Sequence, residues 1–396
     1  MTASGGRPPI GVINAGSSSL KFSFYDGEKR LLSGQVEGIG AHPSASATDA
    51  TGEAVPPPDF GTTPPSTPGE ILPAIMPWAR EHLGTPRLAA LGHRVVHGGA
   101  HHSRPAKVTA ELLAELEALV PLAPLHEPHN LAPIKMMAEL DPELPQVACF
   151  DTAFHRTMPE IEQIFALPYE LYDTGIRRYG FHGLSYEYIA SVLPDQAPEI
   201  ADGRVVVAHL GNGCSACALK AGKSVATTMG FTALDGLVMG TRCGALDPGI
   251  LLHLIEQKGL SGDALTDLLY RRSGMLGLSG VSSDFRELLA STEPRARLAI
   301  EVFCHSTARH IASLAAALEG LDGIVFTAGV GEHAAPVRSA ICRACAWMGL
   351  ELDESANRRP PGRISTQKSS IAAYVIATDE NLMIARHARA MLQSQL

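Results

Sequence analysis

Residues 11–30 read GVINAGSSSLKFSFYDGEKR, and residues 204–225 read RVVVAHLGNGCSACALKAGKSV. Each stretch begins with an apolar run typical of a strand, turns through glycine and serine, and continues into a short hairpin. The chain has 396 residues, which is more than one hydrophobic core usually organises. Two copies of one hairpin in a chain of this length suggest two related domains.

The sequence around these hairpins indicates an α/β fold. Apolar runs that end in polar or glycine residues alternate with helical patterns, which we predict over 130–140, with Asn130 as N-cap, and over 297–320, stopping at Gly320. The proline-rich stretch 41–70 is predicted to be a surface loop. In α/β sheets the chemistry gathers beyond the carboxyl ends of the strands. Those ends carry Asn14, Arg94, Asp151, His209, Gly331 and Glu380.

Composition narrows the class of protein. The net charge of -9 argues against a nucleic-acid partner, because such proteins carry a basic surface. The start MTASGGRPP has no apolar signal region, and no run of about 18 apolar residues predicts a membrane span. The seven cysteines are an odd number and fit a reducing cytoplasm. Two CxxC pairs, Cys214/Cys217 and Cys342/Cys345, weakly indicate zinc or a redox dithiol; ordinary core cysteines are the alternative.

Three glycine-containing turns could each approach a phosphate or ribose closely. They follow apolar runs at Gly16, at Gly211–Gly213 and at Gly329–Gly331, and Lys21 lies on the strand after the first turn. Neither GxxxxGK[ST] nor GxGxxG is present. Each turn alone could be structural. Three in one α/β chain favour a nucleoside triphosphate site.

Charged residues in glycine-rich or strand-end positions suggest what the turns bind. Arg94 and Arg242 lie among glycines, where an arginine is costly unless it meets an anion. Arg177 and Arg178 are better explained as structural ion pairs. Asp151 and Glu380 end apolar runs, where carboxylates near phosphates usually serve Mg²⁺. A charge at a helix N-terminus is the alternative for Glu380.

Taken together, the motifs resemble those of the acetokinase family, within the sugar-kinase/actin-like superfamily. The similarity runs from about Ile10 to Ala388 and rests on VINAGSSSLKF, HRVVHGG, CFDTAFH, RRYGFHG, VAHLGNG, MGFTALDGLVMGTR and VFTAGVGE, in the family's order. It implies two ribonuclease-H-like α/β domains with an active-site cleft between them. The expected domains are 1–152 plus 382–396, and a nucleotide-binding domain over 153–381. It also implies a cytoplasmic homodimer that uses ATP and Mg²⁺, with Mn²⁺ as a substitute metal.

The resemblance assigns positions to the nucleotide and the metal. It implies that Asn14 and Glu380 help to place Mg²⁺. The residues implied to face the nucleotide phosphates are Ser17, Ser19, Lys21, His209, Leu210, Gly211, Asn212 and Gly213. Those implied to bind the adenosine part are Asp284, Phe285, Arg286, Gly329, Val330, Gly331, Glu332 and His333.

The implied reaction is the reversible in-line transfer of the γ-phosphoryl group of ATP to acetate, with propionate or another short-chain acid as the alternative acceptor. Arg94 and Arg242 would hold acetate and the moving phosphoryl group, and His182 and Arg242 would stabilise the transition state. The residues implied to line the acyl pocket are Val96, Leu125, Phe181 and Ala233. His126 is implied to bind the substrate from the cleft. A non-catalytic ATP-dependent scaffold is a competing interpretation, but a scaffold needs no clamp for an acyl anion.

Asp151 is the acid/base candidate that the family implies. A carboxylic acid has a reference pKa of about 4, so the acceptor has no proton to lose at neutral pH. We therefore expect Asp151 to orient Mg²⁺ or an arginine. The chain departs from the family's usual pattern at Glu127, Leu184, Tyr186, Cys214, Cys243, Ala245 and His333.

Overall fold

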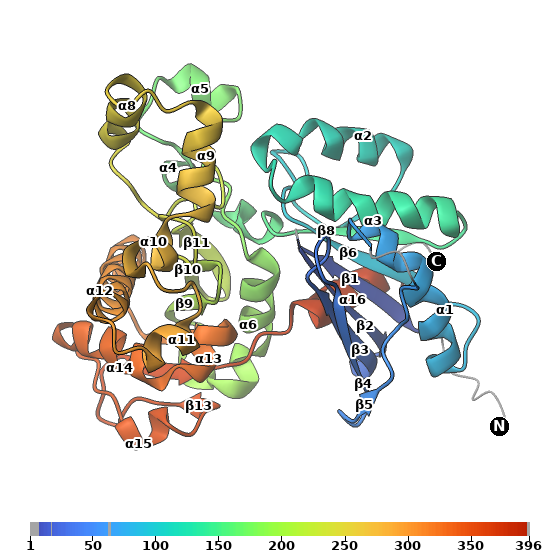
Figure 1. Ribbon diagram of the computed structural model, residues 1–396. Helices are drawn as coiled ribbons and strands as arrows, with labels where there is room; N and C mark the ends of the chain where they lie inside the picture. The colour runs from blue at the N-terminus through green and yellow to red at the C-terminus, as the bar shows by residue number, and fades with distance from the viewer. Residues whose placement is uncertain (1–7, 17, 62–64, 394–396) are drawn as a thin grey trace. The chain divides into compact units, whose positions relative to one another are not determined.

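The computed structural model describes residues 8–16, 18–61 and 65–393, and the chain divides into two compact units. The first ends at Phe154 and resumes at Asp379; the second spans His155–Thr378. The first unit therefore receives the C-terminal helix back from the end of the chain (Figure 1).

In its described residues the first unit contains an eight-stranded sheet with the order β5-β4-β3-β2-β1-β6-β8-β7. β1, β2 and β3 pair antiparallel, whereas β1, β6 and β8 run parallel. The strands are β1 Ile10–Ala15, β2 Ser19–Asp26, β3 Lys29–Glu37, β4 Ser44–Asp49, β5 Ala54–Val55, β6 Ala90–Val95, β7 Ala106–Lys107 and β8 Gln146–Phe150. The helices are α1 Leu72–Leu83, α2 Ala110–Ala118, α3 Glu127–Leu140 and α16 Glu380–Gln393.

Alternation of side chains along the strands places helices on both faces of this sheet. Phe22, Phe24 and Leu91 face a core that includes Ile75 of α1 and Met137 of α3. The positions next to them face the other way: a Cβ at Gly92 would lie 2.5 Å from Ile384 of α16, and Ser23 accepts a hydrogen bond from Asn381. The sheet is therefore covered on one face by α1 and α3 and on the other by α16.

Two predictions for this unit need correction. The proline-rich stretch 41–70 is not all loop, because β4 pairs with β3 and β5 pairs with β4 at the sheet edge. The helix predicted from Asn130 begins at Glu127, with His126 as N-cap. Pro128 follows in the first turn, where its missing N–H costs nothing.

The second unit contains, in its described residues, a six-stranded sheet with the order β11-β10-β9-β12-β14-β13. The strands are β9 Arg204–Leu210, β10 Cys214–Lys220, β11 Lys223–Thr227, β12 Gly323–Thr327, β13 Gly362–Arg363 and β14 Ala372–Val375. The helices are α4 Glu160–Gln163, α5 Tyr169–Asp173, α6 Gly183–Gln196, α7 Pro198–Ala201, α8 Pro248–Glu256, α9 Gly262–Arg271, α10 Gly274–Ser279, α11 Phe285–Ala290, α12 Pro294–Ala317, α13 Ala328–His333, α14 Ala335–Ala344 and α15 Glu354–Asn357.

The two sheets share one topology. In each, three antiparallel strands connected in sequence (β1–β2–β3 and β9–β10–β11) are followed by two strands parallel to the first (β6 and β8, or β12 and β14). The echo between residues 11–30 and 204–225 therefore marks the first two strands of two equivalent sheets. The predicted α/β fold with two related domains is confirmed.

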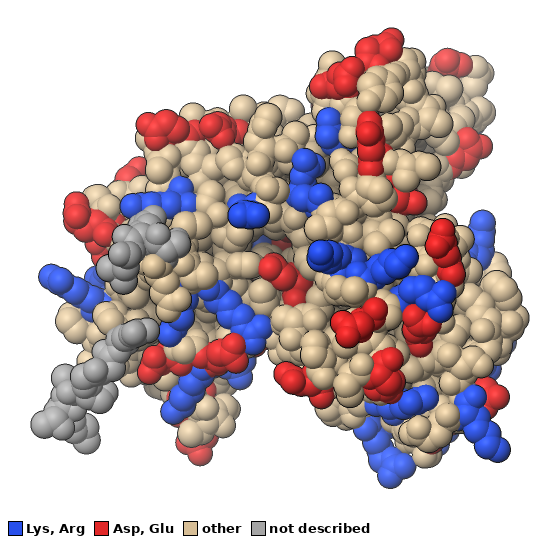
Figure 2. Space-filling model, turned by 180° about the vertical axis from the view of Figure 1, so that it is seen from behind, with Lys and Arg blue, Asp and Glu red and all other residues tan. Residues whose placement is uncertain are grey.

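The surface is mixed in charge. On the face in Figure 2, acidic and basic side chains of the described residues are interspersed, and no broad area carries lysine and arginine alone. Among the described residues, no helix combines the length and apolar character that a membrane crossing requires.

Candidate active site

Arg94 and Asp151 form the best-defined ion pair at the carboxyl ends of the parallel strands of the first unit. Arg94 lies near the end of β6 and Asp151 directly follows β8. The guanidinium donates from Nε to both carboxylate oxygens at 3.1 Å and from Nη2 to Oδ2 at 2.6 Å. Asp151 is 1% exposed. Burial favours the neutral form of Arg94, but Asp151 and Glu380 outweigh it and raise its pKa above the ordinary value. The guanidinium is thus a fixed cation.

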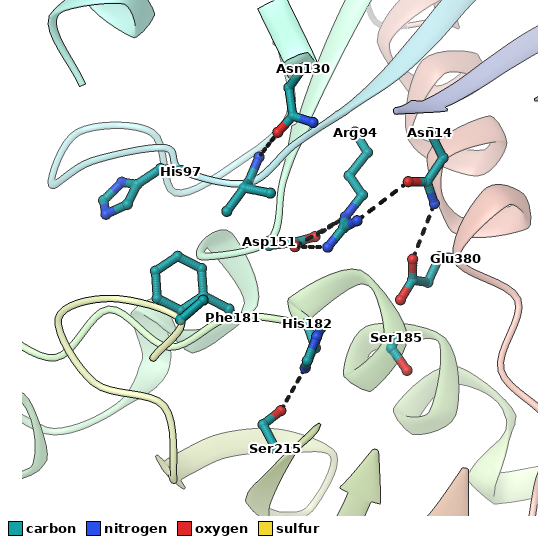
Figure 3. Close-up of polar contacts among 12 residues, drawn as sticks. Asn14, Arg94, His97, Asn130, Asp151, Phe181, His182, Ser185, Ser215 and Glu380 are labelled. Carbon is teal, nitrogen blue, oxygen red and sulfur yellow. Dashed lines mark hydrogen bonds and ion pairs between the residues drawn. The ribbon is translucent and has the colours of Figure 1, made fainter. Parts of the chain in front are cut away.

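Asn14 continues this arrangement toward Glu380 at the start of α16 (Figure 3). Its Oδ1 accepts from Arg94 Nη1 at 3.4 Å, and its Nδ2 donates to Glu380 Oε2 at 3.2 Å. Lys21 is the register partner of Asn14 across the β1–β2 hairpin, so both side chains project from the same face of the sheet. Cationic, amide and carboxylate groups therefore meet at one strand end.

The loop after β6 is held by buried polar groups. Asn130, inside α3, accepts from the Val96 N–H at 2.9 Å and donates to the Ala15 carbonyl at 2.7 Å. Glu127 accepts from the His97 N–H at 3.2 Å. These contacts tie the ends of β1 and β6 to α3 and fix Val96, a predicted acyl-pocket residue, which is 4% exposed. Leu125, also predicted to line that pocket, and His126, predicted to bind the substrate, are half-buried just before α3.

Glu127 is an unusual buried carboxyl group. It is 0% exposed, and its Oε1 has no hydrogen-bond partner among the described residues. Burial raises its pKa to about 8, an increase that the His97 N–H opposes and the nearby Asp151 reinforces. Burial also lowers the pKa of His97 to about 4. At neutral pH the two side chains are therefore both uncharged.

In the second unit, three segments far apart in sequence line one pocket of about 500 Å³. They are the β9–β10 turn, the start of α11 and helix α13, and all three were predicted to contact the nucleotide. The lining residues are Gly211, Asn212, Ser283, Asp284, Phe285, Arg286, Leu289, Gly329, Val330, His333 and Ala334. Pockets of this volume suit small-molecule ligands and cofactors.

The tip of the β9–β10 hairpin also touches two predicted catalytic side chains. A Cβ at Gly213 would lie 2.8 Å from Arg242 Nη2 and 3.4 Å from His182 Nε2. Arg242 is anchored by donation from Nη1 to the Ala233 carbonyl at 2.6 Å. The absence of a side chain at Gly213 therefore lets a guanidinium and an imidazole approach the same turn.

His182 is placed by its backbone as well as by its neighbours. It is the N-cap of α6 with φ 59°, a left-handed conformation that is unfavourable for a non-glycine residue. Its Nδ1 lies 2.8 Å from Ser215 Oγ of β10 (Figure 3). Its ring stacks on His209, with centroids 4.2 Å apart, and His209 Nδ1 lies 2.8 Å from Ser185 Oγ.

Phe181, which was also predicted to line the acyl pocket, is held through its backbone. Its carbonyl accepts a hydrogen bond from His155 Nε2 at 2.9 Å. Burial lowers the pKa of His155 to about 4. His155 is therefore a neutral residue that positions the chain just before His182.

The other predicted site residues are placed as follows. Ser17 lies outside the described residues, Ser19 begins β2 with a half-buried side chain, and Leu210 is buried at the end of β9. Glu332 accepts from the Ala328 N–H at 2.8 Å, so its carboxylate braces its own helix. Asp284 caps α11 and pairs with Arg286, which lowers the pKa of Asp284.

The Cys214/Cys217 pair does not form a dithiol site. Cys214 and Cys217 lie on β10, where residues three apart point to opposite faces of the sheet. Cys217 Sγ contacts Ser224 Oγ at 3.3 Å, whereas Cys214 Sγ contacts the Gly211 carbonyl. All seven cysteines are free thiols. In the described part of the chain, no group of three or more His, Cys, Asp or Glu side chains is arranged to hold a metal.

Sequence reasoning missed Asn130, Ser215 and Tyr186 as residues that organise this site. Asn130 looked like a helix cap, and Ser215 was hidden in an apolar strand. Tyr186 was noted only as a departure from the family's pattern, but its hydroxyl hydrogen-bonds to Ser215 Oγ. For Ser215 the available signal was a hydroxyl inside an otherwise apolar strand.

Comparisons with known proteins show the family to which the chain belongs. A family model described as the acetokinase family matches residues 10–386. An acetate kinase of Rhodopseudomonas palustris is 50% identical over 387 residues, covering 95% of this chain and 96% of the relative. A solved propionate kinase from Francisella tularensis has a TM-score of 0.88 at 37% identity, covering 96% of this chain and 98% of its own. A solved acetate kinase from Porphyromonas gingivalis has a TM-score of 0.86 at 36% identity, and the match covers 97% of this chain and 100% of the solved one.

Proposed function

Because the chain belongs to the acetokinase family and is a phosphotransferase, we propose that it transfers the γ-phosphoryl group of ATP reversibly to acetate, giving acetyl phosphate and ADP. The observation that carries this proposal is the second unit's pocket. Three separated segments converge on it, and the hairpin tip that lines it also contacts Arg242 and His182. A nucleotide seated there would present its phosphates to a guanidinium and an imidazole.

The first unit supplies groups suited to a short carboxylate. Arg94 is a permanently charged donor that can hold a carboxylate through two hydrogen bonds, and Val96 adds an apolar side chain close to it in sequence. Both reactants are anions, so the residues act mainly by positioning the acetate oxygen in line with phosphorus and by stabilising charge on the phosphoryl oxygens. Arg242 and His182 serve the phosphoryl oxygens.

Asp151 acts as an orienting group in this proposal. Acetate is already ionised at neutral pH, since its carboxyl group has a pKa of about 4. Both oxygens of Asp151 are engaged by Arg94. Asp151 therefore holds the guanidinium in the direction that the acceptor needs, rather than removing a proton.

Asn14 and Glu380 fit a metal that arrives with the nucleotide. Mg²⁺ prefers oxygen ligands and usually binds through one or two carboxylates plus substrate phosphates rather than in an all-protein cage. The Glu380 carboxylate accepts from the Asn14 amide nitrogen, and the Asn14 amide oxygen accepts from Arg94. The two side chains therefore lie together at the end of β1 and could offer oxygen ligands of this kind. Mg²⁺, or Mn²⁺ in its place, would neutralise charge on the phosphates of ATP or ADP.

The test is an assay with ATP, Mg²⁺ and acetate in which acetyl phosphate is trapped as the hydroxamate. We expect acyl phosphate that depends on all three components and that is lost in Arg242→Ala. ATP hydrolysis without acyl phosphate would overturn the proposal and favour an ATP-dependent scaffold.

Propionate is the second candidate acceptor, because a solved relative with a TM-score of 0.88 is a propionate kinase. A single methylene changes discrimination in an apolar pocket by only about 1 to 3 kcal/mol. Comparison of kcat/KM for acetate, propionate and butyrate decides between them. We expect acetate to be the best substrate, with measurable use of propionate.

We also propose that the chain works as a homodimer in the cytoplasm. Seven free thiols suit a reducing compartment. Helix α8 supports self-association, because none of its residues is buried although most of them are apolar.

A further inference from the structure

Tyr186, Ser215 and His182 form a chain of hydrogen bonds that ends on the catalytic imidazole. Tyr186 lies on α6, one turn beyond His182, and Ser215 lies on β10. The Tyr186 hydroxyl bonds to Ser215 Oγ, and Ser215 Oγ lies 2.8 Å from His182 Nδ1. Both Tyr186 and Ser215 are 0% exposed, so water does not compete for these groups.

The number of protons in this chain decides its direction. The phenol and the serine hydroxyl each carry one proton, and each can accept through its oxygen. Among the described residues, Ser215 Oγ is the hydrogen-bond partner of the Tyr186 hydroxyl. If the phenol donates to Ser215, the serine proton is left for Nδ1, and Nδ1 must be the unprotonated nitrogen.

The opposite direction of donation leaves one proton without an acceptor. A proton on Nδ1 would be donated to Ser215, whose own proton would then point to the Tyr186 oxygen. The phenolic proton would have no acceptor in the described part of the chain, and an unsatisfied buried donor costs about 1 to 3 kcal/mol. Loss of the phenolic proton does not relieve this conflict, because burial raises the pKa of Tyr186 well above its ordinary value.

We propose that Tyr186, acting through Ser215, holds His182 as the neutral tautomer with its proton on Nε2. Nε2 faces the hairpin tip at Gly213, where Arg242 Nη2 also lies. His182 thus presents an N–H donor on the side shared with Arg242. This inference rests on the proposed function, in which that donor meets an oxygen of the transferred phosphoryl group. Tyr186 and Ser215 are positioning residues in it.

The direct test is ¹⁵N NMR of the full chain labelled in histidine, recorded at pH 7.5. The His182 signals are assigned by their loss in His182→Gln. We expect a pyrrole-like Nε2 that carries the proton and a pyridine-like Nδ1. A protonated Nδ1 in the wild-type protein would overturn the inference, whether or not the chain phosphorylates acetate. Conversely, a wild-type protein that has the expected tautomer but does not phosphorylate acetate would overturn the proposed function and leave the tautomer assignment standing.

Tyr186→Phe tests the consequence for catalysis. We expect kcat to fall about fivefold, the equivalent of one hydrogen bond, with KM for acetate within twofold and with protonated Nδ1 now detectable. Tyr374→Phe is the matched control, because it removes another largely buried phenol of the same unit that bonds to Glu199 instead. The control is expected to keep the wild-type kcat and tautomer.

Ser215→Ala keeps the inference testable where Tyr186→Phe folds poorly, because it removes the hydroxyl 2.8 Å from His182 Nδ1 while the phenol stays in place. Protonated Nδ1 should then be detectable in this single variant, and an unchanged tautomer would overturn the inference. Where Tyr186→Phe folds, the double variant adds a second test. Because Tyr186 acts through Ser215, the double variant should lose no more kcat than Ser215→Ala alone. Additive losses in the double variant, or an unchanged tautomer in Tyr186→Phe, would show that Tyr186 does not act on His182 through the serine.

Discussion

At the scale of single residues, the site depends on a few groups whose freedom is removed by their neighbours. Arg94 is held by Asp151, and Arg242 by the Ala233 carbonyl. Glu127 is buried without charge. Three substitutions test these constraints separately, because each changes one atom or one small group.

Asp151→Asn is expected to lower kcat/KM for acetate by about 10² to 10³, because the Arg94 donor loses its orientation. The loss should persist when the pH is raised to 9, since acetate is already ionised. The Mg²⁺ concentration that gives half-maximal rate should be unchanged. Asp141→Asn, which breaks a separate Arg–Asp pair with a 2.7 Å contact, is the control and should retain full activity. Recovery at high pH would instead identify Asp151 as a base.

Glu127→Gln is expected to change the pH dependence of stability. The folded carboxyl has a pKa of about 8, against a usual value of 4.5. Between these values the folded state binds more protons than the unfolded state, so the free energy of unfolding falls as the pH rises. Glutamine does not titrate, so the variant should lose less stability between pH 5 and 9, by a few kcal/mol at about 1.4 kcal/mol per pKa unit.

Urea unfolding at pH 5.5, 7 and 9 measures this difference. Glu139→Gln is the control, because Glu139 lies exposed on the same helix α3; its unfolding curves should follow those of the wild type. Parallel wild-type and Glu127→Gln curves across the whole range would mean that Glu127 is charged in the folded protein.

Gly213→Ala is expected to fold normally and to lose about 10² in kcat. The new Cβ would lie 2.8 Å from Arg242 Nη2, so the flexible end of the arginine must move, which costs little stability but displaces a charge from the phosphoryl group. Gly262→Ala is the control, because nothing lies within 4 Å of its new Cβ. Steady-state kinetics and thermal unfolding of both variants are the measurements. An active Gly213→Ala variant would remove Arg242 from the proposed site.

At the scale of elements, the sequence predicted the strands well because their signals are local. Apolar runs ending in glycine or polar residues correspond to β1, β6, β8, β9, β12 and β14, and the two hairpins revealed that the sheet occurs twice. The start of α3 and the edge strands β4 and β5 were not predicted. Pro128 in the first turn favours the earlier start of α3. β4 and β5 form because β3 offers them an edge to pair with. Local periodicity shows neither effect.

The contacts between elements were also beyond sequence reasoning. Asn130 fits a helix-cap pattern equally well, and only the fold shows that it bridges Ala15 and Val96. The direction of the Tyr186–Ser215–His182 chain likewise depends on the packing of α6 against β9 and β10. Sequence therefore predicted most residues of the candidate site, and Asp151 as an orienting group, but not the positioning roles of Asn130, Ser215 and Tyr186.

Asn130→Ala tests the bridge between α3, β1 and β6. It leaves the Val96 N–H and the Ala15 carbonyl without their partner, so we expect the free energy of unfolding to fall by about 2 to 4 kcal/mol. KM for acetate should rise, because Val96 is no longer fixed. Denaturant unfolding and acetate titration measure the two effects. Wild-type stability would show that the bridge is not needed.

At the scale of the whole molecule, each unit provides a different part of the proposed reaction. The first holds the arginine proposed to bind the acceptor and the groups proposed for a metal, and the second holds the pocket proposed for the nucleotide. Both sheets present the carboxyl ends of parallel strands, where ligands usually bind, so each unit has an edge that can receive one part of the reaction. What remains exposed on the second unit then points to self-association.

Helix α8 is the feature that predicts a homodimer. Ile250, Leu252 and Ile255 are 42%, 58% and 47% exposed. Single apolar residues at a surface are ordinary, but several along one helix are not. We expect Leu252→Glu to convert the dimer to a monomer, because a carboxylate buried at an apolar interface has no partner. Sedimentation equilibrium should give twice 41.9 kDa for the wild type and 41.9 kDa for the variant.

Leu140→Glu is the matched control, because Leu140 is 47% exposed at the end of α3 in the other unit. It should leave the dimer intact, since the neighbouring surface of α3 is not uniformly apolar. A wild-type chain that sediments at 41.9 kDa at micromolar concentration would contradict the homodimer. A dimer that persists in Leu252→Glu would place its interface away from α8, because an unpaired charge at the centre of an apolar contact is too costly for association to survive.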